Sequence, residues 1–178
     1  MLFEDISILD EFYEIRHNMF VGTKGSKITY ISEDEPEDSK AFGTIYNGIN
    51  RLLIPGFYNS HAHSPMSLLR GYGEGLQLQE WLHEKIFPFE SKINAEDVYW
   101  GTLLSMAESM RFGIVSSTDM YFLTDGLVRA VIDSGMKGNI CRSVSNFGLL
   151  PPVDDPTYNE MVYTVEKYQG AANGRIII

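Results

Sequence analysis

Two histidines separated by one residue, His61 and His63, are the side chains of this sequence best suited to bind a metal. Residues two apart on a β-strand point to the same face, so the two imidazoles would project side by side. Neutral imidazole binds zinc, iron, nickel or copper, at about 2.0–2.1 Å in the case of zinc. From the spacing alone, two neighbouring surface histidines would be a better interpretation than a metal site. Their place directly after the apolar run 52–59, which predicts a buried strand, favours a metal site at the strand's carboxyl end.

Two ligands do not complete a catalytic zinc site, which normally has three protein ligands and an open position. The other histidines are His17, in the N-terminal region, and His83. The pair His83-Glu84 lacks a histidine at position 87, where the zinc motif His-Glu-x-x-His requires one. Asp119 could complete a site, but nothing in its spacing singles it out.

The elements that would position these residues change in character along the chain. In the first fifty residues, short apolar runs at 6–9, 28–31 and 44–46 alternate with glycine-marked turns, which is typical of small strands. From residue 52 onward, predicted strands at 52–59, 114–118, 139–145 and 175–178 alternate with predicted helices. The helices are a segment capped by Asn94 and stopped by Gly113, then 125–134 and 156–169. We therefore divide the chain into an N-terminal region, 1–51, and an α/β region, 52–178.

Alternating strands and helices build a parallel sheet with right-handed crossovers. Four strands with three helices would form the first half of a (β/α)8 barrel, which takes roughly 250 residues in full. A small open α/β sheet is the competing architecture, and the pattern alone does not separate the two.

Composition excludes several classes of function. The 178 residues carry a formal net charge of −10, which disfavours binding to nucleic acid and to anionic lipid. No apolar run approaches the ~18 residues that a membrane span needs. The single cysteine, Cys141, precludes an intrachain disulfide and, with no signal peptide recognisable, predicts a cytoplasmic protein. Its apolar surroundings predict an inert core residue.

Five segments taken together resemble the amidohydrolase superfamily, and within it the branch that holds 5-methylthioadenosine/S-adenosylhomocysteine deaminases and related chlorohydrolases. The resemblance runs along nearly the whole chain, and the ordered set is far more specific than the histidine pair alone. The segments are PGFYNSHAH (55–63), MSLLRG (66–71), EWL (80–82), EDVYWGT (96–102) and TDMY (118–121).

The resemblance implies a (β/α)8 barrel together with a small β-sandwich, whose N-terminal strands would be residues 1–51. It also implies one divalent metal, usually zinc, held by the His-x-His pair, two later histidines and a late aspartate. His61 and His63 match the pair, and the other ligands have no counterpart in the sequence. Glu90 falls where the family binds the purine or ribose, and Arg142 matches an arginine that binds substrate in the deaminases. The competing interpretations are an exposed acid at a helix end for Glu90 and a surface ion pair for Arg142.

The function implied is hydrolysis of a non-peptide C–N bond, most simply deamination of a small purine-type or related heterocycle. A metal would lower the pKa of its bound water towards 7, and the hydroxide would attack an electron-poor ring carbon. A second arginine used by some deaminases has no counterpart in residues 146–159, which puts an adenosine-type substrate in doubt.

Two other hypotheses remain. In the first, the chain is a catalytically incomplete half-barrel, inactive alone because the remaining ligands and proton-transfer groups are expected beyond residue 178. Its open strand edges would then favour a homo-oligomer or a partner chain that supplies the missing half. In the second, it is a small metal-binding α/β domain without catalytic activity.

Overall fold

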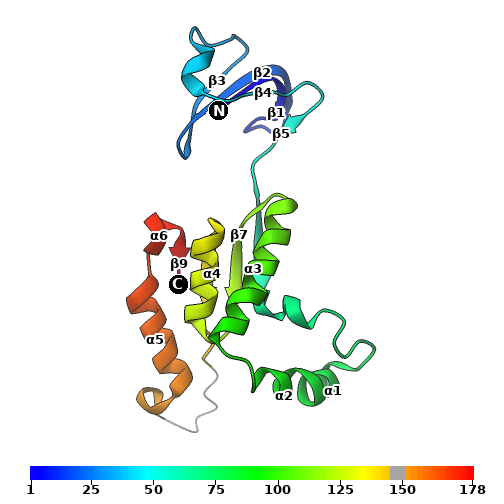
Figure 1. The fold of residues 1–178 in the computed structure, drawn as a ribbon, viewed down its shortest axis with the longest axis vertical. Coiled ribbons are helices and arrows are strands. Elements are labelled where there is room, and N and C mark those ends of the chain that lie inside the picture. Colours follow the sequence, from blue (N-terminus) through cyan, green and yellow to red (C-terminus); the bar gives the residue numbers. More distant parts are fainter. Residues whose placement is uncertain (145–150) are drawn as a thin grey trace. The chain divides into compact units, whose positions relative to one another are not determined.

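The structure is a computed structural model that describes residues 1–144 and 151–178. The chain forms two compact units, Met1–Pro55 (unit 1) and Gly56–Ile178 (unit 2). Each unit has its own sheet and its own hydrophobic core (Figure 1). No helix in the described residues is long and apolar enough to cross a membrane.

Unit 1 is a five-stranded sheet in which three consecutive strands form an antiparallel meander. The strands are β1 (Leu2–Leu9), β2 (Ile15–Lys24), β3 (Lys27–Ser32), β4 (Ile45–Asn47) and β5 (Leu52–Leu53). Their order is β3-β2-β1-β4, and β5 also pairs with β1. A short 3₁₀ segment, Ser39–Phe42, precedes β4. The core consists of Ile6, Ile8, Met19 and Val21. The sequence did not predict β2, because its first half is exposed and contains the polar residues 16–18, which leaves only the short apolar run 19–21 as a signal.

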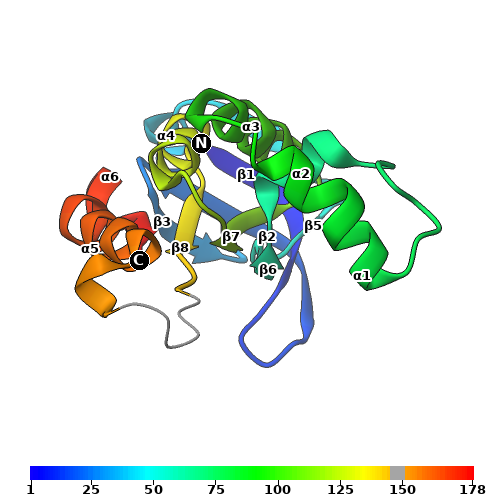
Figure 2. The same cartoon turned by 90° about the horizontal axis from the view of Figure 1, so that it is seen from below.

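Unit 2 contains a parallel sheet of four strands in the order β6-β7-β8-β9, which confirms the predicted parallel α/β arrangement. The strands are β6 (Phe57–Ala62), β7 (Ile114–Met120), β8 (Lys137–Cys141) and β9 (Ile176–Ile177). Three long helices connect them: α3 (Ala95–Arg111), α4 (Thr124–Ser134) and α5 (Pro156–Tyr168). Figure 2 shows α3 and α4 next to each other on the same side of the sheet. The expected third strand, 139–145, ends at Cys141, and Ser145 lies outside the described residues.

Short and irregular helices fill the connection between β6 and α3. They are the 3₁₀ segment Ser64–Leu69, α1 (Leu78–Glu80), a π-helix at Trp81–Ile86 and α2 (Phe87–Glu90). Near the end of the chain, a 3₁₀ segment at Pro152–Asp154 precedes α5, and α6 (Ala171–Gly174) follows it. A π-helical turn is rare and frequently marks a functional site, because it displaces side chains from the regular helical face.

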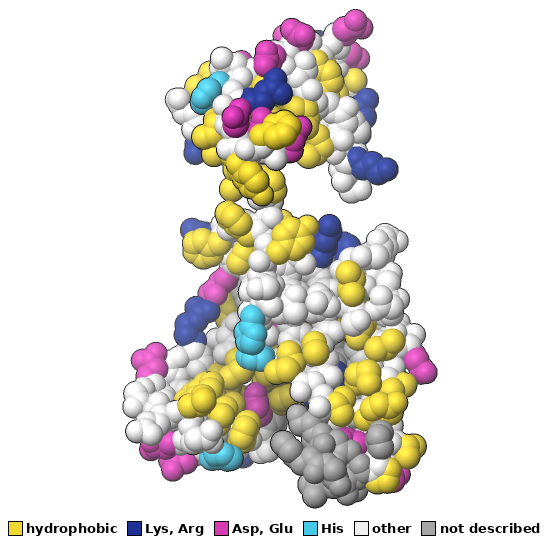
Figure 3. Space-filling view, turned by 180° about the vertical axis from the view of Figure 1, so that it is seen from behind, with side chains coloured by type: hydrophobic (Ala, Val, Ile, Leu, Met, Phe, Trp, Pro, Cys, Tyr) yellow, Lys and Arg dark blue, Asp and Glu magenta, His cyan; other side chains and the backbone are white. Residues whose placement is uncertain are grey.

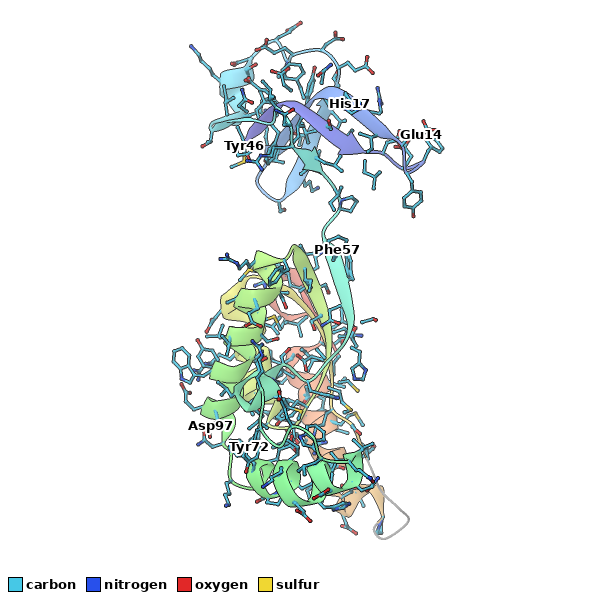
Figure 4. All side chains as sticks on the ribbon, turned by 90° about the vertical axis from the view of Figure 1, so that its right-hand side faces the viewer. Glu14, His17, Tyr46, Phe57, Tyr72 and Asp97 are labelled. Carbon is cyan, nitrogen blue, oxygen red and sulfur yellow. The ribbon has the colours of Figure 1, made fainter. Side chains whose placement is uncertain are left out.

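The core of unit 2 lies between the sheet and helices α3 and α4. It contains Val98 and Met106 from α3, Leu127, Val128 and Val131 from α4, and Ile140 and Ile176 from the sheet. The predicted cap of α3 is confirmed, because the Asn94 side chain accepts hydrogen bonds from the backbone N–H groups of Glu96 and Asp97. Figure 4 labels Asp97 at this end of the helix.

Two sequence expectations about burial are wrong. The run 52–59 is not one buried strand: Leu52 and Leu53 pair with β1, Pro55 interrupts the run, and Phe57 and Tyr58 in β6 are 55% and 69% exposed. Phe57 and Tyr58 are adjacent in β6, so their side chains point to opposite faces of the sheet, and neither face is buried at this position. Cys141 is exposed rather than buried, because it alternates with buried Ile140 and points to the opposite face of β8.

Candidate metal and substrate site

A cavity of about 260 Å³ in unit 2 gathers three of the four residues that the sequence singles out. His63 follows β6, Glu90 ends α2, and Arg142 directly follows β8. The carboxyl ends of neighbouring parallel strands meet at one edge of a sheet, which explains why residues so distant in sequence line the same space. The full lining is His63, Met66, Trp81, Leu82, Ile86, Phe87, Glu90, Met120, Tyr121, Phe122, Arg142 and Ser143.

The two candidate ligands lie together at the carboxyl end of β6. Ala62 between them pairs with buried Asp119 on β7, so His61 and His63 take the opposite face by strand alternation. Their ring centroids are 5.0 Å apart, with an angle of 80° between the ring planes. From the side opposite to Figure 1, unit 2 exposes histidine side chains (cyan) beside hydrophobic ones (yellow) (Figure 3). His61 itself is exposed and does not line the cavity.

One hydrogen bond determines which ring nitrogen of His63 carries a proton. Its Nδ1 lies 2.7 Å from the carbonyl oxygen of Met120, the last residue of β7. A carbonyl oxygen only accepts hydrogen bonds, so Nδ1 carries the proton and donates it. In the neutral ring, Nε2 then keeps its lone pair. Metal-binding histidines commonly donate their second N–H to a backbone carbonyl in this way.

Asp119 holds the residue that follows His63. The Asp119 side chain is fully buried, and its Oδ1 and Oδ2 lie 3.1 and 3.3 Å from the backbone N of Ser64, which donates to them. Burial raises the pKa of this carboxyl, while the hydrogen bonds from Ser64 and the nearby imidazoles of His63 and His61 act in the opposite direction. From the sequence, Asp119 is a possible metal ligand. The structure shows it as a partner of the backbone next to the histidine pair.

Glu90 lies at the end of α2, but it is not an exposed acid, and it has a hydrogen-bond partner. It is partly buried, and its Oε1 accepts a hydrogen bond of 2.7 Å from the hydroxyl of Tyr121, the residue directly after β7. In the sequence Tyr121 stands out only as part of the motif TDMY, because contact between two segments so far apart cannot be read from spacing.

Arg142 forms an ion pair, but one that is largely buried at the cavity wall. Its Nε lies 2.5 Å from Oε2 of Glu160 on α5, and the two side chains are 15% and 26% exposed. Glu160 also accepts a hydrogen bond of 3.0 Å from the backbone N–H of Thr124, at the start of α4. Glu160 therefore links both α4 and α5 to Arg142. The sequence did not predict this role.

The rest of the cavity wall is mostly apolar and aromatic. Trp81, Leu82 and Ile86 come from the π-helix, and Phe87 begins α2. On the other side, Phe122 stacks on Tyr121 with ring centroids 4.5 Å apart. A space with aromatic walls and a few polar groups suits a flat heterocycle.

The described residues, 1–144 and 151–178, supply two imidazoles at this site and no cluster of three or more His, Cys, Asp or Glu side chains placed to hold a metal. His17 lies on β2 of unit 1, with its Nδ1 2.9 Å from the hydroxyl of Ser7 (Figure 4). His83 is exposed on the π-helix, where it packs edge-on against Phe87. The two imidazoles of His61 and His63 fit a divalent metal in donor type and placement, but they are only part of a ligand set.

Comparisons with known proteins point to one family. The sequence profile of the Amidohydrolase family matches residues 52–166. A 5-methylthioadenosine/S-adenosylhomocysteine deaminase from Dictyoglomus thermophilum is 38% identical over 179 residues, which is 99% of this chain and 40% of the relative. A 5'-deoxyadenosine deaminase from Methanocaldococcus jannaschii is 40% identical over 147 residues, covering 83% of this chain and 33% of the relative.

Solved structures show the same fold. An adenosine deaminase from Xanthomonas campestris with bound zinc superposes with a TM-score of 0.80 at 24% identity, covering 99% of this chain and 41% of that protein. An atrazine chlorohydrolase from Arthrobacter aurescens in complex with zinc also gives 0.80, at 18% identity, covering 99% and 45%. The chain thus spans less than half the length of the proteins that it matches.

Proposed function

Because this chain belongs to the amidohydrolase family, we propose that it carries part of the metal and substrate site of a hydrolase that deaminates a small purine-type heterocycle. The observation that carries the proposal is the single cavity that brings His63, Glu90 and Arg142 together from three separate segments. Relatives named as deaminases of adenosine derivatives support the substrate class.

His61 and His63 would hold one divalent metal, for which zinc is our first choice because zinc is present in two structures of the same fold. Bound there, the metal would act as a Lewis acid and make a water molecule more acidic. The chain itself prepares His63 for this role, since the bond from Nδ1 to Met120 keeps Nε2 available. Asp119 holds the adjoining backbone and so restricts where the His63 ring can lie.

Glu90 and Arg142 would bind the polar groups of the substrate. A carboxylate accepts hydrogen bonds from hydroxyl and amino groups, and a guanidinium donates to ring nitrogens or oxygens. Trp81, Phe87 and Phe122 would cover the faces of a heterocycle and exclude water from it. The substrate would therefore be oriented by its polar edge and enclosed by the aromatic wall.

We also propose how the two units fit the architecture of the family. The parallel sheet of residues 52–178 would be the first part of a (β/α)8 barrel, and residues 1–51 would contribute strands to a small β-sandwich. The relatives are longer than this chain. The other metal ligands and the proton-transfer groups would come from polypeptide outside these 178 residues, either continuous with it or in a partner subunit.

Zinc content and deamination test this proposal together. We expect the protein, purified together with the polypeptide that completes its site, to retain zinc after dialysis and to release ammonia from adenosine or 5-methylthioadenosine. His61→Ala and His63→Ala should each lower the zinc content measured by mass spectrometry, because each removes an imidazole ligand. His83→Ala is the matched control, since His83 is an exposed histidine whose ring packs edge-on against Phe87 away from the histidine pair. Unchanged zinc in both ligand variants would contradict the proposed metal site.

A further inference from the structure

Glu90 and Tyr121 form a hydrogen-bonded pair in the wall of the cavity. The phenol oxygen of Tyr121 lies 2.7 Å from Oε1 of Glu90, and both residues line the same space. The tyrosine is 7% exposed, whereas the glutamate is partly exposed to the cavity. Within residues 1–144 and 151–178, the Tyr121 hydroxyl is the hydrogen-bond donor found for this carboxylate, and its other acceptor positions could take a ligand.

The two partners differ in how firmly the backbone holds them. Tyr121 directly follows β7, its N–H donates to the carbonyl of Cys141 at the end of β8, and its ring stacks on Phe122. Glu90 instead ends a helix of four residues, after a connection built from 3₁₀ and π-helical turns. A side chain carried by such a connection needs an anchor on the sheet if its carboxylate is to keep one position.

The phenol is suited to be that anchor. Burial raises the pKa of the Tyr121 hydroxyl, and the hydrogen bond to Glu90 raises it further. The hydroxyl therefore stays protonated and donates throughout the ordinary pH range. Hydrogen bonds to a carboxylate are shorter and stronger than those between neutral groups, so the pair restricts the carboxylate more than water could.

We propose that Tyr121 is a positioning residue, which holds the Glu90 carboxylate at the orientation needed to accept hydrogen bonds from a nucleoside. The inference rests on the proposed function, because it assigns to Glu90 a contact with substrate. Tyr121 also follows Met120, whose carbonyl holds His63. Two consecutive residues at the end of β7 thus orient one group of the candidate metal site and one group of the candidate substrate site.

A double-mutant cycle with adenosine as the probe tests the inference. Calorimetry on the protein freed of its metal by a chelator, so that adenosine is not deaminated, would measure the Kd of adenosine for the unmodified protein, Tyr121→Phe, Glu90→Ala and the double variant. Tyr121→Phe keeps the buried ring, and we expect it to weaken binding by about tenfold, the effect of one lost hydrogen bond to a charged group. In the Glu90→Ala background the same change should have no further effect, because no carboxylate remains to be positioned.

Tyr99→Phe is the matched control. Its hydroxyl donates to Oδ2 of Asp133 at 3.0 Å, which is also a tyrosine–carboxylate pair, but neither residue lines the cavity. Adenosine binding should be unchanged in this variant. Equal losses from Tyr121→Phe in both backgrounds would show a merely structural role and overturn the inference, as would no loss in either. If the unmodified protein does not bind adenosine, the proposed function fails and the inference fails with it.

Discussion

At the scale of single residues, the end of β7 holds the segment that follows β6. Asp119 accepts hydrogen bonds from Ser64 N–H, and the Met120 carbonyl accepts one from His63. These contacts run from a strand inside the sheet to the strand at its edge. His63, which directly follows the edge strand, is therefore positioned by the neighbouring strand.

Asp119→Ala tests this arrangement. The substitution leaves the buried N–H of Ser64 without an acceptor, which we expect to lower the unfolding free energy by about 1–3 kcal/mol. Because Asp119 supports the candidate metal ligand, zinc affinity should fall by roughly ten- to a hundredfold. Ser117→Ala is the control on the same face of β7: Ser117 is 3% exposed, and in the described part of the chain its hydroxyl has no hydrogen-bond partner. Denaturant unfolding and zinc titration should leave this control nearly unchanged, and an equal loss in both variants would contradict the role of Asp119.

At the scale of elements, α3 and α4 approach each other at a glycine. A Cβ atom added to Gly126 on α4 would lie 2.2 Å from the carbonyl oxygen of Ala95 in the first turn of α3. Replacing glycine by alanine inside a helix ordinarily stabilises a protein by about 0.5–1 kcal/mol. Here the sign should reverse, because the backbone of α3 must move.

Gly126→Ala should therefore lower the unfolding free energy by about 1–3 kcal/mol, the usual cost of overpacking. Chemical denaturation measures it. The control is Asn159→Ala on α5, an exposed position whose side chain donates to the Val153 carbonyl. A Gly126→Ala protein more stable than the parent would show that the two helices can separate without cost.

A second contact between elements joins α4 to α5 and depends on pH. Asp125 accepts hydrogen bonds from Tyr168 at 2.6 Å, from Tyr163 at 3.1 Å and from the ammonium of Lys167 at 3.3 Å. Burial acts to raise the pKa of Asp125, but these donors outweigh it and hold the pKa below the ordinary 3.8. A carboxyl with a lowered pKa in the folded protein stabilises it above pH 3.8, and this contribution disappears as the pH falls through the lowered pKa.

Asp125→Asn should thus be less stable than the parent at pH 7. The difference should be about 1 kcal/mol at most, because the Asp125 side chain is 51% exposed and water screens the pair. It should shrink as the pH is lowered below 3.8. Urea unfolding of both proteins at pH 7 and at pH 3 gives the comparison, and a difference that is the same at both pH values would contradict this account.

At the scale of the whole molecule, the chain contains two cores of unequal size. The core of unit 1 consists of a few aliphatic and sulfur-containing residues on β1 and β2, whereas that of unit 2 extends across α3, α4 and the parallel sheet. Every described residue of the candidate site, from His61 to Glu160, belongs to unit 2. The net charge of −10 predicts a protein that does not bind nucleic acid. Association with a second copy or with a partner chain also stays a prediction.

The sequence by itself determined the elements whose signals lie in consecutive residues. Asn94 with its acidic neighbours predicts the start of α3, helical periodicity predicts α4 and α5, and the order of the motifs indicates the family. The interruption of the run 52–59 and the exposure of Cys141 were not predicted. The sequence shows which residues are apolar and how they are spaced. Whether a face of a strand is buried depends on the elements that pack against it in the folded chain.

Only the tertiary structure decided which groups act together. Tyr121 meets Glu90, Glu160 meets Arg142, and Met120 fixes the protonated nitrogen of His63. The members of each pair lie in different segments of the chain, so neither their distance nor their geometry is encoded in their spacing in the sequence. Parallel strands bring their carboxyl ends to one edge, and it is this convergence that assembles the site from residues far apart in the chain.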